Sequence, residues 1–170
     1  TDRNGESMLY TLDAKGRTIS ILGPKEAKAG KPYTIRYEYP DLNKSHSAGQ
    51  LPYALTRNYD PEHNRDIETY TYADGLGRAV QVKKTASIFK GRGLADEEKH
   101  IISGKQIYDA LGRVVETYYP FTASVQSQLV PAPSSSIPPT KTLYDEKDRP
   151  VEQILPDGAS VKTAYKITHH

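Results

Sequence analysis

The chain has 170 residues whose 23 basic and 21 acidic side chains nearly cancel, and the basic residues are scattered, which argues against a nucleic-acid partner. It contains no Cys, so disulfides, thiol nucleophiles and zinc-thiolate sites are excluded, and no apolar stretch approaches the roughly 18 residues that a membrane span requires. Hydrophobic residues make up only 36%, and 13 Tyr accompany two Phe and no Trp, which favours a thin, ordered β structure with half-wet surfaces.

The first predicted element is a β-hairpin over residues 8–22, built around Asp13-Ala-Lys-Gly-Arg17. Asp13 opens the turn because its carboxylate accepts hydrogen bonds from amides ahead of it, and Gly16 stands where a three-residue hairpin loop requires positive φ. After Arg17, residues 18–22 alternate like a strand with one face on a core and one in water. The segment therefore predicts a strand, a turn and a second strand.

Three further copies of this turn predict hairpins over about 66–84, 105–120 and 140–167. The four arginines are separated by 61, 35 and 36 residues, and the near agreement of the last two intervals indicates stacked copies of one unit. Val80 is expected to face the core and Gln81 to face water. Asp148 replaces the glycine in the fourth copy, and Asp tolerates positive φ. The predicted turn residues are Asp13, Gly16, Arg17, Asp74, Gly77, Arg78, Asp109, Gly112, Arg113, Asp145, Asp148 and Arg149.

The last unit carries two further signals. Pro150 has no amide hydrogen to donate, so it must lie at the start of a strand or at the edge of a sheet. Pro156-Asp-Gly158 is typical of a turn, and residues 160–167 then predict an additional antiparallel strand.

Three excursions separate the units, at residues 23–58, 86–105 and 123–140. The first contains a predicted strand at 33–39 and has room for a degenerate copy of the unit, with Asn58-Tyr-Asp60 and Arg65 as its candidate remnant. In the second, Ala95–His100 is predicted to form a turn or two of helix. The third holds four Pro and five Ser, which predicts an extended loop.

Tyr108-Asp-Ala-Leu-Gly-Arg113 and Leu143-Tyr-Asp-Glu-Lys-Asp-Arg149, each leading into a strand, resemble the YD repeat of the rearrangement-hotspot (Rhs) family. Residues 66–84 resemble the core of large bacterial Rhs and insecticidal toxin-complex-like proteins, and the resemblance covers most of the chain. It implies an all-β fold in which antiparallel hairpin repeats form a section of an extended, curved sheet or shell with long irregular loops. Residues 1–170 are then expected to be a single YD-repeat region of a longer protein.

The resemblance also implies a function. The chain is expected to be a non-catalytic structural module of a shell that packages or delivers a C-terminal toxin. The implied partners are flanking repeats of the same polypeptide and an enclosed toxin domain. The implied location is secreted or associated with a bacterial cell surface.

No catalytic residue, cofactor or metal site is expected. The four turn aspartates recur at one structural address, whereas catalysis normally needs residues at different addresses. His46, His63 and His100 lack the spacing of metal ligands. The turn arginines are expected to pair with a local aspartate or carbonyl group instead of binding anions.

A second hypothesis is a carbohydrate-binding or adhesive cell-surface module. An exposed ladder of tyrosines would stack on sugar rings, although packing within the sheet is the favoured explanation for these side chains. The candidate glycan-stacking residues are Tyr70, Tyr72, Tyr108, Tyr118, Tyr119 and Tyr144.

Overall fold

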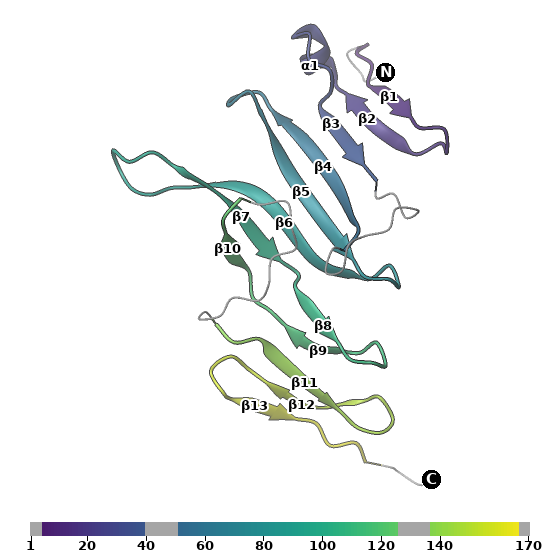
Figure 1. Cartoon of the computed structure of the whole chain (residues 1–170), viewed down its shortest axis with the longest axis vertical. Coiled ribbons are helices and arrows are strands. Elements are labelled where there is room, and N and C mark those ends of the chain that lie inside the picture. The colour runs from purple at the N-terminus through teal and green to yellow at the C-terminus, as the bar shows by residue number, and fades with distance from the viewer. Residues whose placement is uncertain (1–4, 40–50, 126–136, 167–170) are drawn as a thin grey trace.

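The computed structural model describes residues 5–39, 51–125 and 137–166, and within them the chain is antiparallel β structure in two open sheets (Figure 1). The all-β prediction is confirmed. The first sheet contains, in spatial order, β1 (Leu9–Leu12), β2 (Thr18–Leu22), β3 (Ile35–Glu38), β4 (Tyr53–Asp60), β5 (Arg65–Ala73), β6 (Ala79–Ile88), β7 (Glu97–Ser103) and β10 (Phe121–Ala123). The second contains β13 (Ser160–Lys162), β12 (Pro150–Ile154), β11 (Thr140–Tyr144), β9 (Val114–Thr117) and β8 (Gln106–Tyr108).

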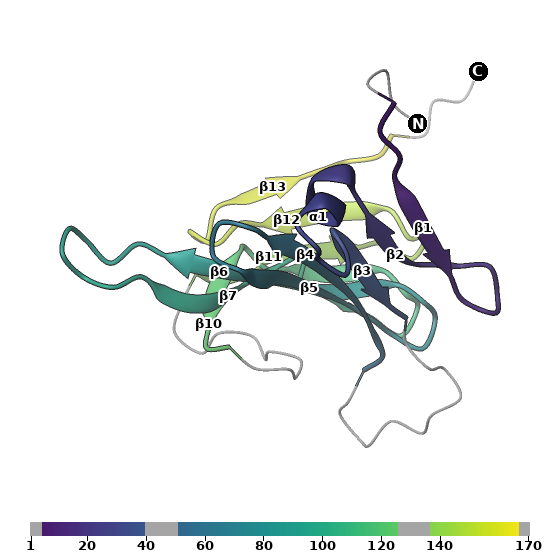
Figure 2. The same ribbon diagram turned by 90° about the horizontal axis from the view of Figure 1, so that it is seen from above.

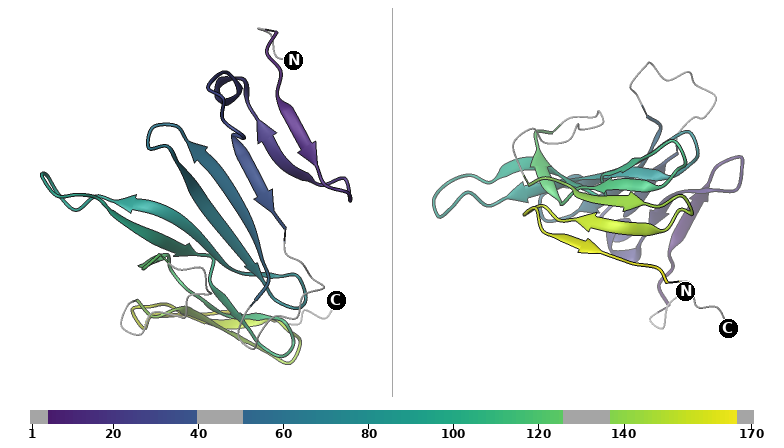
Figure 3. Two further views of the ribbon diagram at one scale, coloured as in Figure 1. Left: turned by 45° about the horizontal axis from the view of Figure 1, so that its top comes forward. Right: turned by 90° about the horizontal axis from the view of Figure 1, so that it is seen from below.

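One long hairpin belongs to both sheets. Its β7 and β10 segments pair in the first sheet, and its β8 and β9 segments pair in the second. Gly104, with φ of 60°, lies between β7 and β8, and the amide of Tyr118 donates to the carbonyl of Lys105 at 2.9 Å across the bend. Figures 2 and 3 show the second sheet set at an angle to the first. The hairpins therefore follow one another along a single bent ribbon.

The core lies on one face of β4 to β7, where a row of paired side chains crosses the sheet. Leu55 pairs with Tyr70, Tyr70 with Lys83, and Lys83 with Ile102. All four are buried, because paired residues of neighbouring strands point to the same face. This core is half polar, since Gln81, Lys83, Thr85 and His100 are buried in it beside the hydrophobic residues and Tyr72.

The prediction that Gln81 faces water is wrong. Gln81 is fully buried and pairs with Tyr72, while Val80 also packs against the core cluster. A β-bulge between Tyr72 and Ala73 changes the register directly after the turn, and a simple alternation read from the sequence does not include that bulge.

The prediction of helix at Ala95–His100 is also wrong. The prediction that residues 86–105 lie outside the strands is wrong for most of them, because β6 extends to Ile88 and β7 begins at Glu97. Glu97–Ser103 forms β7, which pairs with β6 through Thr85 and His100 and through Ile88 and Glu97. Glu and Lys favour helix intrinsically, but pairing along the neighbouring strand outweighs that weak preference.

The excursion at 23–58 is more ordered than the sequence predicts. It contains β3, most of β4 and the short helix α1 (Pro24–Lys28), which begins with the proline that suits a first helical turn. Asp60 and Arg65 are paired at the turn between β4 and β5. This turn shares two features with the repeated one, since the Asp60 carboxylate accepts from the amide two residues ahead at 3.0 Å and the residue before Arg65 has a φ of 50°. It is one residue longer, and the Arg65 side chain bonds Glu98. Residues 126–136 of the predicted loop at 123–140 lie outside the described residues, as does His46.

Two predictions for the last unit agree with the structure. Pro150 is the first residue of β12, opposite Tyr144, where no ladder hydrogen bond is required of it. Gly158 has φ of 86°, and its turn leads into β13. The predicted strand at 160–167 is too long, because pairing with β12 ends at Lys162 and residue 167 lies outside the described residues.

Candidate functional site

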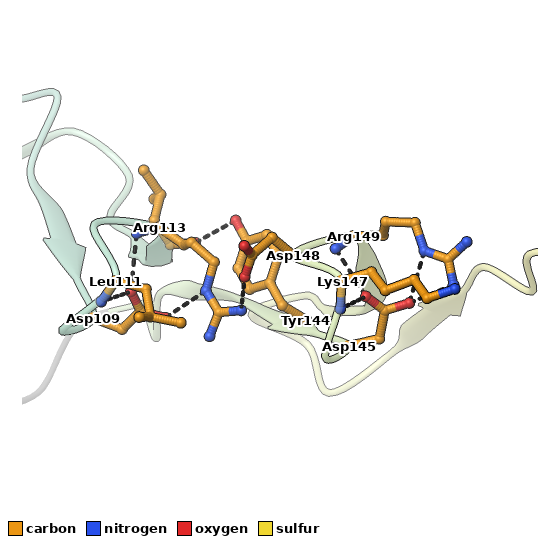
Figure 4. Close-up of polar contacts among 9 residues, drawn as sticks. Asp109, Leu111, Arg113, Tyr144, Asp145, Lys147, Asp148 and Arg149 are labelled. Atoms are coloured by element: carbon orange, nitrogen blue, oxygen red, sulfur yellow. Dashed lines mark hydrogen bonds and ion pairs between the residues drawn. The ribbon is translucent and has the colours of Figure 1, made fainter.

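The repeated turn is one hydrogen-bonded structure that occurs four times. In the third copy, Oδ1 of Asp109 accepts from the amides of Leu111 and Arg113, each at 2.9 Å, and Oδ2 accepts from Nε of Arg113 at 2.7 Å (Figure 4). The amide of Gly112 donates to the carbonyl of Asp109 at 3.0 Å, and φ of Gly112 is 83°. The turns that begin at Asp13, Asp74 and Asp145 repeat each of these contacts.

These hydrogen bonds hold the turn carboxylates ionised. The hydrogen bond from the Arg149 side chain lowers the pKa of Asp145 to about 2, and the amide of Arg113 lowers the pKa of Asp109. A carboxylate with a lowered pKa is a poor general acid at neutral pH. The arrangement builds a turn and orients an arginine.

The oriented arginine contacts the next hairpin. The guanidinium of Arg113 lies 4.8 Å from the centre of the Tyr144 ring, and the Tyr144 hydroxyl donates to the carbonyl of Val114 at 2.9 Å. We call this three-residue contact the Arg–Tyr clasp. It joins the outgoing strand of one unit to the incoming strand of the next, so it fixes the spacing of successive hairpins.

Among the residues that the structure describes, four junctions carry the clasp. In each, a tyrosine lies against the arginine of the preceding turn and donates to the carbonyl of the residue directly after that arginine. The guanidinium-to-ring distances run from 4.0 to 4.8 Å and the hydroxyl-to-carbonyl distances from 2.7 to 3.3 Å. The four clasps are Arg17, Thr18 and Tyr39; Arg78, Ala79 and Tyr108; Arg113, Val114 and Tyr144; and Arg149, Pro150 and Tyr165.

At two of the junctions, the arginine makes one more hydrogen bond to the next turn. Nη1 of Arg78 donates to the carbonyl of Gly112 at 3.1 Å, and Nη1 of Arg113 donates to Oδ1 of Asp148 at 2.6 Å. Both acceptors belong to the positive-φ residue of the next turn. Figure 4 shows Arg113 lying between Asp109 of its own turn and Asp148 of the next.

The clasp locates a hairpin unit in the 61-residue interval, where the sequence leaves room for a degenerate copy. Tyr39 directly follows β3 and clasps Arg17, as Tyr108 and Tyr144 clasp the arginines before them. Strands β3 and β4 therefore take the place of a hairpin unit, and residues 39–52 connect them. A tyrosine at the end of the predicted strand at 33–39 was the available sequence signal.

Sequence reasoning also misses a buried lysine. Nζ of Lys83 donates to the Tyr72 hydroxyl at 2.9 Å and lies 4.5 Å from the centre of the Tyr70 ring. Burial lowers the pKa of Lys83 to about 8 and also lowers the pKa of His100. The Tyr70 hydroxyl donates to Oε2 of Glu68 at 2.6 Å. The group combines charged and aromatic side chains on the core face of β5 to β7.

Tyr70 and Tyr72 do not belong to an exposed ladder of tyrosines; they are 8% and 2% exposed and face the core, in line with the favoured explanation of packing within the sheet. Tyr108 and Tyr144 are engaged in clasps, and Tyr118 donates to Glu116 at 2.7 Å. Tyr119 is 49% exposed and lies beside an open hollow lined also by residues 117, 118, 120, 140, 153 and 155.

Within residues 5–39, 51–125 and 137–166, no group of three or more His, Asp or Glu side chains has the arrangement of a metal site. His63 is paired with Asp60 at 2.7 Å, and His100 lies in the core. The same residues contain no helix with the length and apolar character needed to cross a membrane.

A profile of the family described as Domain of unknown function (DUF6443) matches residues 52–154. Among curated proteins, none matches this sequence. Among solved structures, the crystal structure of TcdB2-TccC3 is similar with a TM-score of 0.71 and 20% identity, covering 97% of this chain and 10% of that one. TcdB2-TccC3-TEV gives 0.68 and 16%, and TcdB2-TccC3 without its hypervariable C-terminal region gives 0.66 and 18%, each over 97% of this chain and 12% of the other. The chain thus shares its fold with about a tenth of those proteins.

Proposed function

We propose that this chain, which belongs to the family described as Domain of unknown function (DUF6443), is a non-catalytic section of the wall of a YD-repeat shell that packages or delivers a toxin. The observation that carries the proposal is the Arg–Tyr clasp, which recurs at four junctions along one bent ribbon. A contact that joins each hairpin to the next is a device for building an extended sheet.

The similar structures support this proposal at the level of fold. They are TcdB2-TccC3 complexes, and they align with nearly the whole of this chain. The proposal has three parts. The chain packages a toxin, it is exported or associated with a bacterial surface, and its partners are flanking repeats and an enclosed toxin domain. The chain spans only 10% to 12% of the similar structures, so the complete shell needs much more polypeptide than these residues.

Limited proteolysis tests the shell directly. The longest natural polypeptide that contains this chain is purified, and the survival of segments outside the YD-repeat region is followed by mass spectrometry. A closed shell protects an enclosed segment while surface loops are cut. Uniform digestion of all other segments at the rate of the loops would overturn the proposal.

A matched pair of variants connects that protection to the clasp. Tyr108→Ala with Tyr144→Ala removes two clasps, whereas Tyr119→Ala removes an exposed ring that makes none. We expect protection to fall in the double variant and to persist in the single one.

For the carbohydrate hypothesis, the candidate binding surface is the hollow beside Tyr119 and not a ladder of tyrosines. Only Tyr119 of the six candidates is more than a third exposed, and its hollow also contains Tyr118 and Gln153. Binding on a glycan array that disappears in Tyr119→Ala would favour this second function. Binding that persists in the variant would place any glycan site elsewhere.

A further inference from the structure

A histidine is buried where β7 pairs with a strand on each side. His100 is 2% exposed, and it pairs with Thr85 of β6 and with Ala123 of β10. β10 has three residues and is the last strand of the first sheet, whereas β7 continues through the bend at Gly104 into β8 of the second sheet. We call the pairing of β7 with β6 and β10 the β7 seam. A change at His100 therefore acts on the strand that joins the two sheets.

A buried cation lies next to this histidine. Lys83 pairs with Ile102, two positions along β7 from His100, so both side chains point to the core face. The ring of His100 is centred 6.1 Å from the ring of Tyr70, and Nζ of Lys83 lies 4.5 Å from the centre of that same ring. A proton added to His100 places a second positive charge beside the first, in a core that water hardly reaches.

Two carboxylates on the same face are held by other groups. Glu68 of β5 accepts from Nε of Arg57 at 2.9 Å and from the Tyr70 hydroxyl at 2.6 Å. Glu98 of β7 pairs with Arg65 at 2.9 Å. β10 adds no charged side chain, since it consists of Phe, Thr and Ala. A new charge on the histidine therefore meets carboxylates that already have cationic partners.

These surroundings favour the neutral imidazole. Burial is the main reason that the pKa of His100 lies below its ordinary value of 6.5, and the charge of Lys83 lowers this pKa further. Glu68 and Glu98 act in the opposite direction, each by less than Lys83. The folded chain then binds fewer protons than the unfolded chain below about pH 6.5, so its stability falls as pH drops through this range.

We propose that protonation of His100 in mild acid loosens the β7 seam, so that the ribbon opens where its two sheets join. The neutral ring fits the core, whereas the charged ring needs water, which it reaches when β10 detaches and β7 separates from β6. As a way of opening a shell wall in an acidified compartment, this device rests on the proposed function. The loosening itself is a property of these strands and does not require a shell.

Hydrogen–deuterium exchange followed by mass spectrometry measures the seam directly. The longest natural polypeptide that contains this chain is labelled at pH 7 and at pH 5, and each rate is divided by the intrinsic rate of an unfolded peptide at that pH. At pH 5 the carboxyl of Asp145 remains ionised, because its pKa is about 2. We expect the amides of β7 and β10 to exchange at least about tenfold faster at pH 5 on this corrected scale, and those of β11 and β12 to be unchanged.

Three variants and a matched control assign the response. His100→Phe keeps a ring beside Tyr70 without a titrating group, and His100→Gln keeps polarity without one, so both should lack the acid response whatever their protection at pH 7. Lys83→Met should reduce the response, because one of the two cations is then absent. His63→Gln is the control and should respond fully, since His63 is 58% exposed and pairs with Asp60 away from the seam.

Equal corrected protection of β7 and β10 at the two pH values would overturn the proposal. An acid response that persists in both His100 variants would do the same, because another group would then cause it. Equal loosening of every strand, with β11 and β12 included, would show that acid acts on the whole fold and not on the seam. None of these outcomes depends on whether the polypeptide encloses a toxin, which limited proteolysis measures separately.

Discussion

The hydroxyl of Tyr144 donates a hydrogen bond to the main-chain oxygen of Val114, 30 residues earlier in the chain. The oxygen belongs to the residue directly after Arg113, whose guanidinium lies against the same tyrosine ring. The Tyr144 side chain therefore contacts both the arginine of the preceding turn and the first residue of the strand that leaves that turn.

Removing parts of Tyr144 separates the two halves of this contact. Tyr144→Phe keeps the ring and loses the hydroxyl, so we expect the free energy of unfolding to fall by about 0.5 to 1.5 kcal/mol. Tyr144→Ala also loses the guanidinium stacking, which adds about 1 kcal/mol or more. Urea titration measures both. Tyr119→Phe serves as the control and should leave stability unchanged, because its hydroxyl makes no clasp.

Gly112→Val is expected to destabilise the chain by about 1 kcal/mol or more, because a β-branched residue is strained at a φ of 83°. A Cβ at this position also approaches Nη1 of Arg78 to 2.7 Å, so the arginine must move. Gly16→Val is the matched variant, since its φ is 75° and its Cβ would meet nothing within 4 Å. Thermal melting of both should show a loss at Gly16 from strain alone and a larger loss at Gly112. Equal melting temperatures for the unaltered chain and Gly112→Val would contradict the turn assignment.

Acid should weaken the turns through their carboxylates. The pKa of Asp145 is lowered from 3.8 to about 2, so its stabilising contribution is complete above its unfolded pKa and is lost as pH falls from about 4 to about 2. Asp145→Asn removes this titration. Urea midpoints measured across that pH range should fall less steeply in the variant than in the unaltered chain, and parallel curves would show that Asp145 does not contribute.

Alkali should have the opposite effect through Lys83. Its pKa is lowered from 10.5 to about 8, so burial of the charged form opposes folding below pH 8, and this opposition is relieved as pH rises toward the unfolded value. We expect stability to rise between about pH 8 and pH 9.5, before tyrosines of the unfolded chain ionise. Lys83→Met should lack that rise. An identical pH profile in the variant would assign the rise to another group.

The local part of this structure was predictable from the sequence. Every hydrogen bond inside the turn at Asp109 reaches at most four residues, so Asp, Gly and Arg at fixed spacing are sufficient to indicate it. The strand that follows each arginine is likewise a local pattern. This is why the predicted hairpin turns coincide with the observed ones.

The missed features depend on distant neighbours. Tyr39 clasps a carbonyl 21 residues away, and nothing near Tyr39 in the sequence identifies that carbonyl. The sequence predicts that Gln81 faces water and does not indicate that Lys83 is buried, whereas the pairing of β5, β6 and β7 places both on the core face. His100 follows a run of charged helix-forming residues, and only its pairing with Thr85 explains why the run is a strand.

The clasp also constrains how such a chain can change in length. The last three turn arginines are 35 and 36 residues apart, and each interval supplies one arginine to the hairpin ahead and one tyrosine to the hairpin behind. Duplication or loss of one such interval adds or removes two antiparallel passes of the chain, such as β6 and the continuous run of β7 and β8, so the antiparallel alternation and every remaining clasp are preserved. Gene segments of this length are therefore natural units of growth for the ribbon, whereas a change of half an interval would leave an arginine facing the wrong strand.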